Sequence, residues 1–207
     1  SEFVDDLQYM DEQLTQVLNS TGLYTPPIVP YPESITFVKQ QSFLAGFFTE
    51  KRSLTVMEVR HLFQNALSNA LGKALLTGFM QVVQAPKLKD YLVRGQKMAN
   101  EYYDTFTDIL RNEDIAIPST LDGEVTASTE SPFSDKLIMS HASLLIPIGF
   151  DNFGRALTMV RRRDLTATLA KMMVAVSAYA EDGVNLSIEM GWLEQPPLAL
   201  DRKELQK

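Results

Sequence analysis

The sequence predicts an all-α protein in which two helical hairpins are joined by one long crossover, with an extra helix at the N-terminus. Three observations lead to this prediction. Apolar residues recur every three or four positions along five long segments, as they do on one face of a helix. The joints inside each hairpin are short, and residues 115–133 between the hairpins have no periodicity. This connectivity is that of a ferritin-like four-helix bundle.

The first predicted helix covers residues 3–19. Asp5 and Asp6 lie in its first turn, where the helix dipole favours negative charge, and Gly22 is typical of a helix stop. Prolines and aromatic residues in 23–52 predict a linker, because each proline fixes its own φ and disfavours helix in the residue before it. The apolar face of the helix consists of Phe3, Leu7, Met10, Leu14 and Val17; the linker contains Pro26, Pro27, Pro30, Pro32, Phe37, Phe43, Phe47 and Phe48.

The first hairpin is predicted over residues 53–114. Thr55 and Glu58 have the spacing of a capping box, which starts a helix that runs to about residue 84. Pro86 fits the first position of the next helix, where its missing N–H costs nothing. The short joint makes the two helices antiparallel neighbours. Their expected inward positions are Val59, Phe63, Ala66, Leu67, Ala70, Leu71, Ala74 and Leu75, then Leu88, Tyr91, Leu92, Gly95, Met98, Ala99, Tyr102, Phe106, Ile109 and Leu110.

The second hairpin follows the crossover at residues 115–133. Ser134 is predicted to cap its first helix, with a kink at Pro147 and an end at residues 161–163, where arginines meet the negative end of the helix dipole. Asp164 is predicted to cap the last helix. The expected inward positions are Leu137, Ile138, Leu144, Leu145 and Ile148, then Leu165, Leu169, Met172, Met173, Val176, Ala180 and Val184.

The two ends of the chain carry a similar signature. Tyr9 is followed 17 positions later by Pro26-Pro27, and Tyr179 is followed 17 positions later by Pro196-Pro197, each time through a glycine. Equal endings indicate equal units. We therefore interpret residues 1–22 as the last helix of a preceding repeat, 23–52 as a linker, 53–197 as a complete four-helix repeat and 198–207 as a tail.

Four short stretches carry a resemblance to a known family: residues 54–58 (LTVME), residues 132–136 (PFSDK), residues 162–164 (RRD) and the ending from Gly191 to Pro197. In this order they resemble a domain-of-unknown-function family of tandem ferritin-like four-helix bundles from spore-forming Gram-positive bacteria, with a distant resemblance to spore-coat bundle proteins. The resemblance implies the fold and a connection with sporulation. It transfers no catalytic residue.

Composition excludes several classes of function. The net charge is −7 and the basic residues are scattered apart from residues 161–163, whereas a nucleic-acid binder clusters its cations against phosphates. The absence of cysteine excludes thiolate catalysis and thiolate metal sites. No apolar run approaches the length that spans a bilayer. We expect no nucleic-acid partner, no membrane span, and a cytoplasmic or spore-associated location.

A ferritin-like bundle raises the possibility of a metal centre. Such centres use two Glu-x-x-His motifs, and this chain has one, from Glu58 to His61. We interpret Glu58 as the capping residue instead, and His61 as part of a solvated or interfacial face with Asn65, Ser68 and Asn69. The other histidine, His141, lacks the glutamate three positions before it. The remaining candidate metal ligands are Glu101, His141 and Glu181, one on each of three helices.

The leading hypothesis is a non-enzymatic structural or protein-interaction bundle without a cofactor. Its basis is the absence of any complete catalytic site together with the apolar face of residues 3–19, which has to be buried on the bundle of the same chain, on another copy of the chain or on a preceding repeat. One alternative is a divergent ferritin-like metal-binding protein. Another is a carrier of an apolar small molecule, in a cavity near Gly78, Gly95 and the stretch 147–154, lined by Met98, Met172 and Met173; we rank a small-molecule ligand below a protein partner.

Overall fold

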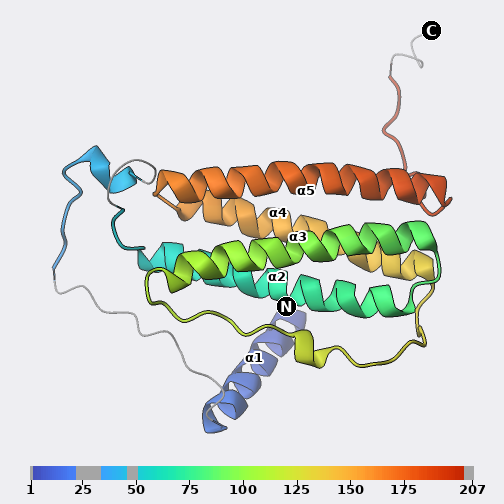
Figure 1. Cartoon of the computed structure of the whole chain (residues 1–207), viewed down its shortest axis with the longest axis horizontal. Coiled ribbons are helices and arrows are strands. Elements are labelled where there is room, and N and C mark those ends of the chain that lie inside the picture. The colour runs from blue at the N-terminus through green and yellow to red at the C-terminus, as the bar shows by residue number, and fades with distance from the viewer. Residues whose placement is uncertain (1, 22–33, 46–50, 203–207) are drawn as a thin grey trace. The chain divides into compact units, whose positions relative to one another are not determined.

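The computed structural model describes residues 2–21, 34–45 and 51–202, which divide into two units, residues 1–37 and 38–207. The first unit contains helix α1, Glu2–Ser20 (Figure 1). All five members of its apolar row are exposed, from Leu7 at 49% to Phe3 at 70%. Several predicted features lie outside the described residues: Gly22, Pro26, Pro27, Pro30, Pro32, Phe47 and Phe48.

The second unit is a bundle of four long helices: α2 (Val56–Val82), α3 (Pro86–Arg111), α4 (Asp135–Met159) and α5 (Arg163–Glu189). Two short 3-10 turns accompany them, η1 (Gln41–Leu44) and η2 (Asp122–Glu124). The all-α class, the four-helix bundle and the extra N-terminal helix are therefore confirmed. Among the described residues, no helix is long and apolar enough to cross a membrane.

Local signals set the helix starts as predicted. The Thr55 hydroxyl accepts the backbone N–H of Glu58, and the Glu58 carboxylate accepts that of Thr55, which completes the capping box. Pro86 occupies the first turn of α3, and the Ser134 hydroxyl caps α4 by accepting the N–H of Leu137. The prediction for Asp164 was wrong: Arg162 stands at the cap position of α5, and Asp164 lies inside the first turn.

The helices form two hairpins, α2 with α3 and α4 with α5, which pack together through α2 on α4 and α3 on α5. Residues 112–134 cross from one end of the bundle to the other beside α2 (Figure 1). At the far end, the backbone N–H groups of Gln84 and Ala85 donate to the Asp135 carboxylate, so α4 starts where α2 ends. Helices α2 and α5 consequently run one way, and α3 and α4 the other.

The core follows the predicted inner rows on α3 but not on every helix. Leu88, Leu92, Phe106 and Leu110 on α3 are fully buried. On α2, the alanines at 66, 70 and 74 are buried instead of the leucines beside them, because small residues let α2 approach its neighbours closely. Several predicted core positions are therefore wrong, each being more than a third exposed: Leu67, Leu71, Leu75, Leu137, Leu144, Ile148 and Val184.

Candidate functional site

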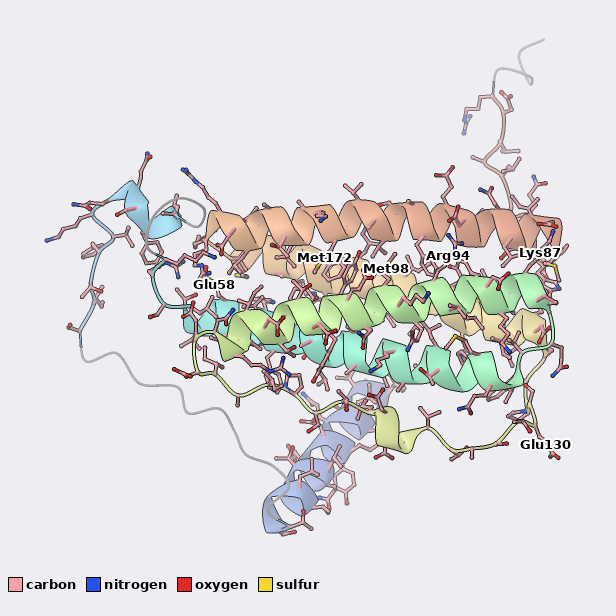
Figure 2. The ribbon with its side chains drawn as sticks, in the orientation of Figure 1. Glu58, Lys87, Arg94, Met98, Glu130 and Met172 are labelled. Carbon is pink, nitrogen blue, oxygen red and sulfur yellow. The ribbon has the colours of Figure 1, made fainter. Side chains whose placement is uncertain are left out.

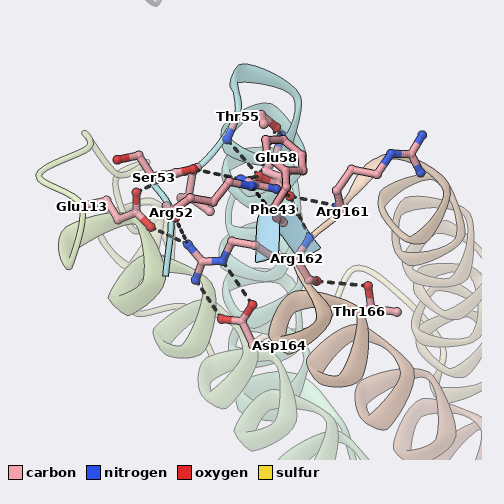
Figure 3. A network of polar contacts seen from close by, with 11 residues as sticks. Phe43, Arg52, Ser53, Thr55, Glu58, Glu113, Arg161, Arg162, Asp164 and Thr166 are labelled. Atoms are coloured by element: carbon pink, nitrogen blue, oxygen red, sulfur yellow. Dashed lines mark hydrogen bonds and ion pairs between the residues drawn. The ribbon is translucent and has the colours of Figure 1, made fainter. Parts of the chain in front are cut away.

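The most concentrated polar structure of the described chain is a charge cluster at the end of the bundle where α2 and α5 begin (Figure 3). At its centre the Glu58 side chain is fully buried. Its carboxylate accepts two hydrogen bonds from the Arg52 guanidinium, at 2.7 and 2.9 Å. It also accepts the backbone N–H groups of Thr55, Arg161 and Arg162 at 2.9, 2.9 and 3.1 Å. Both oxygens of the Glu58 carboxylate are thus saturated with hydrogen bonds.

A second buried group, Arg162, extends this cluster to α3. Its guanidinium, only 3% exposed, donates to Glu113 at 2.6 Å and to Asp164 at 2.8 and 3.1 Å. It also donates to the backbone carbonyl of Arg52 at 3.1 Å, and the other Glu113 oxygen accepts the N–H of Leu54 at 2.7 Å. The cluster therefore joins the segment before α2, the end of α3 and the joint between α4 and α5.

The electrostatics of the cluster favour ionised carboxylates. Burial by itself would raise the pKa of Glu58, but the hydrogen bonds from Arg52 and from three backbone N–H groups outweigh it and lower this pKa to about 2. Burial alone would raise the pKa of Asp164. The hydrogen bonds from Arg162 and Lys51 outweigh burial, so the pKa of Asp164 is lowered as well. A carboxylate with a low pKa and saturated oxygens is a poor general base and a poor metal ligand. The cluster is suited to fastening the bundle end.

Sequence reasoning found Glu58, Arg162 and Asp164 separately, and it missed Arg52, Glu113 and the contacts that join all five. Glu58 was predicted as a capping residue, and the arginines at 161–163 were predicted to complement a helix end. The contact between Glu58 and the joint spans more than a hundred residues. The signal that could have suggested it is the Glu58 carboxylate itself, because a capping box uses one of its oxygens and leaves the other free for a tertiary partner.

The predicted metal ligands do not come together. Glu101, His141 and Glu181 are all exposed, on α3, α4 and α5. The His141 ring packs against the rings of Phe79 and Phe133, with both centroid distances at 6.0 Å. The described residues contain no group of three or more His, Asp or Glu side chains that could hold a metal ion. Glu101, His141 and Glu181 therefore do not form such a group in the described part of the chain.

The centre of the bundle contains a pocket of about 150 Å³ between α2 and α4, which reaches the inner faces of α3 and α5. Gly95 and Met98 line it as predicted, whereas Met172 and Met173 do not. Figure 2 places Met98 and Met172 near the middle of the bundle and Glu58 and Lys87 at opposite ends. Asn65, expected on a solvated or interfacial face, lines the pocket and is only 2% exposed. Its burial favours the interfacial alternative, because the bundle covers the face of α2 that carries Asn65.

A second, more open pocket of about 380 Å³ lies between α2 and the crossover. Gly78, predicted near a central cavity, lines this pocket instead. Phe79 and Val82 of α2 and Val125 and Phe133 of the crossover form much of its wall. The crossover thus packs on α2 through apolar contacts, and the ion pair from Lys73 to Asp122 at 2.9 Å holds it in the same place.

This chain is an all-α bundle protein. Its four long helices are joined by one crossover, with a saturated charge cluster at one end of the bundle and an uncharged pocket at its centre. The chain belongs to the DUF3231 family, described as a protein of unknown function, whose model matches residues 42–205. The predicted membership of a domain-of-unknown-function family is confirmed.

Among solved structures, the chain is similar to a predicted spore coat protein from Bacillus halodurans. The TM-score is 0.66 and the sequence identity 16%, and the match covers 72% of this chain and 98% of the other. At this identity the likeness establishes a common fold. Comparison with curated proteins found no match.

Proposed function

We propose that this chain is a non-enzymatic structural module of the spore that acts by binding protein, through the apolar row of α1. The row consists of Phe3, Leu7, Met10, Leu14 and Val17, and its exposure is the observation that carries the proposal. Apolar side chains that follow one face of a helix stabilise a fold only when another surface covers them. The similarity in fold to a predicted spore coat protein supports the location.

The surface that fits this row is the interior of a bundle like the one formed by α2–α5. On α5, the buried row is Met172, Val176, Tyr179, Gly183 and Leu186, followed by Gly191. The α1 row has the same 4-3-4-3 spacing, and Gly22 follows its last member at the same five-residue distance. This match supports the interpretation of residues 1–22 as the last helix of a preceding repeat, with three equivalent helices as its partners.

This alignment of α1 with α5 is shifted by one residue from the alignment that pairs Tyr9 with Tyr179. If Tyr9 corresponded to Tyr179, then Asp6 and Gln13 would occupy the positions of the buried Val176 and Gly183. Burying an aspartate and a glutamine there would leave polar groups without water. The apolar register places Met10 at the position of Tyr179 and avoids this cost.

Sedimentation velocity tests the binding part of the proposal. Because the apolar row is exposed within its own unit, the chain is expected to associate with a second copy as its concentration rises. The variant Leu7→Gln/Leu14→Gln is expected to sediment as a monomer. The matched control Gln8→Ala/Gln16→Ala changes the opposite face of the same helix and should associate like the wild-type chain. A wild-type chain that stays monomeric at all concentrations would exclude self-association through α1.

Localisation tests the spore part separately. A fluorescent fusion expressed in sporulating cells of the source organism is expected to concentrate at the spore surface and to fractionate with the coat. A fusion that stays evenly distributed in the mother cell contradicts the assignment. Turnover of a substrate by the purified chain with a stoichiometric bound metal would overturn its non-enzymatic character.

A further inference from the structure

The central pocket contains a buried hydrogen-bond acceptor without a partner. Asn65 donates from its Nδ2 to the backbone carbonyl of His61 at 2.7 Å, which fixes the orientation of its side-chain amide. Its Oδ1 is fully buried and accepts no hydrogen bond. Nearly all buried polar atoms in proteins are satisfied, so an acceptor left open in a pocket wall indicates a missing donor. Asn65 lines the pocket, so a molecule bound there is the candidate source of this donor.

The pocket that Asn65 lines has open space at two glycines of its wall. Gly72 on α2 is buried, yet a Cβ atom built on it would meet no atom within 4 Å. Gly149 on α4 also has open space around the position of a Cβ atom. Both glycines line the pocket. A single polar bridge, from Asn152 Nδ2 to Ser68 Oγ at 3.0 Å, links α2 and α4 beside it.

The chemistry of the walls defines the class of occupant. All the lining residues in the described chain are uncharged, and most are apolar, including Leu76, Met98, Phe153 and Val176. A charged molecule would lose its hydration here without a counter-charge. Polar side chains besides Asn65 line part of the pocket, among them Ser68, Asn69 and Asn152, but most of the wall is apolar, and a cavity of roughly 150 Å³ admits a molecule of benzene size.

We infer that this pocket binds a small, neutral, mainly apolar molecule, of the size of one or two fused rings, with one N–H or O–H group that donates to Asn65 Oδ1. The apolar body is held between α2 and α4 over Gly72 and Gly149. The inference is independent of the proposed structural function, because every residue that lines the pocket belongs to the second unit and the α1 row to the first.

Indole and indene are suitable probes, because they have nearly the same shape and only indole carries an N–H donor. Both are titrated into the full chain by calorimetry, with ligand-observed NMR as a second readout. The ratio of their affinities in the wild-type chain is compared with the ratio in Asn65→Leu. A neutral hydrogen bond is worth about 3- to 10-fold in affinity, so the preference for indole is expected to fall by this factor in the variant.

Filling the pocket tests its position. Gly72→Leu is expected to abolish binding of both probes, and Gly72→Ala, which fills less space, to weaken it. Gly154→Leu is the matched control: it makes the same exchange on α4, also at a position with open space, outside the pocket. Thermal unfolding of each variant verifies that it is folded.

Four outcomes would overturn the inference. The first is that neither probe binds the wild-type chain, and the second is that binding survives Gly72→Leu. The third is a crystal structure grown with indole in which ordered water alone occupies Asn65 Oδ1. An unchanged indole-to-indene ratio in Asn65→Leu would remove the donor requirement and with it the assigned ligand class.

Discussion

The rings of Tyr91 and Tyr179 stack face to face between α3 and α5, with a centroid distance of 4.3 Å and an interplanar angle of 4°. Each hydroxyl reaches a glycine of the opposite helix: a Cβ atom at Gly95 would overlap the hydroxyl of Tyr179, and one at Gly183 would overlap that of Tyr91. Each tyrosine lies four residues before the glycine of its own helix, so the arrangement is reciprocal. Burial raises the pKa of both hydroxyls, which keeps the pair neutral.

This reciprocal fit predicts opposite effects of one chemical change at different glycines. At Gly95, alanine is forced against a stacked, buried ring, and overpacking of this kind costs about 1–3 kcal/mol. At Gly72, where a Cβ atom meets nothing, alanine gains helix propensity of up to about 1 kcal/mol. We therefore expect Gly95→Ala to lower the free energy of unfolding and Gly72→Ala to raise it, as measured by urea denaturation.

A second substitution distinguishes steric overlap at Gly95 from a general intolerance of α3 towards substitution. Tyr179→Phe removes the hydroxyl that alanine at position 95 would overlap. It also removes the hydrogen bond from that hydroxyl to the carbonyl of Tyr91, at 3.2 Å, so it destabilises the chain when made alone. In the Gly95→Ala background it is expected to cost less than in the wild-type chain. Additive effects of the two substitutions would argue against the overlap.

The low pKa of Glu58 predicts acid sensitivity. Its folded-state pKa is about 2 and its ordinary value is 4.5, so the folded state binds the proton less readily than the unfolded state. The resulting stabilisation is fully present above pH 4.5 and is lost as the pH falls towards 2. Its size is about 3 kcal/mol. The free energy of unfolding is expected to fall over this range in the wild-type chain, and to fall less steeply in Glu58→Gln.

The buried Arg162 predicts a large difference between two adjacent arginines. Arg162→Met leaves the carboxylates of Glu113 and Asp164 without their buried partner, and breaking a buried ion pair costs about 3–5 kcal/mol. Arg163 is exposed, so Arg163→Met is expected to change stability by less than about 0.5 kcal/mol. Chemical denaturation of the two variants measures the contrast. Equal effects would mean that the cluster does not fasten the bundle end.

The features that could be predicted from the sequence are those decided within a few residues. The Thr55–Glu58 capping box, Pro86 at the start of α3 and Ser134 at the start of α4 depend on contacts of at most three or four positions. The bundle connectivity followed from the lengths of the joints. These features need no knowledge of which helix is the neighbour.

The features that sequence reasoning missed depend on the choice of neighbour. Helix α2 is apolar over much of its circumference, so periodicity could not decide whether Ala70 or Leu71 faces the core. The same ambiguity left open whether Asn65 lies on a solvated or an interfacial face. The meeting of Glu58 with Arg162 requires the joint between α4 and α5 to lie over the start of α2, and no local pattern encodes that position.

The ends of α3 and α5 allow a last prediction, because one backbone motif is built with two different residues. In α5, Gly191 has a φ of +68°; its N–H donates to the carbonyl of Ile188, and the next N–H, of Trp192, donates to that of Ser187. After α3, Asp114 has a φ of +55°, and the N–H groups of residues 114 and 115 donate to the carbonyls of residues 111 and 110. The two helix ends share the hydrogen bonds of the Schellman motif.

The left-handed conformation at this position is free of steric cost for glycine and costs other residues about 1–2 kcal/mol, less for aspartate. Gly191→Ala is therefore expected to destabilise the chain by about 1 kcal/mol, whereas Asp114→Gly should stabilise it by about 0.5 kcal/mol. Urea denaturation of both variants measures the two signs. Asp114→Ala, which keeps the strain and removes the short polar side chain, should destabilise. If Asp114→Gly destabilised the chain instead, a contact of the aspartate would outweigh backbone strain at the end of α3.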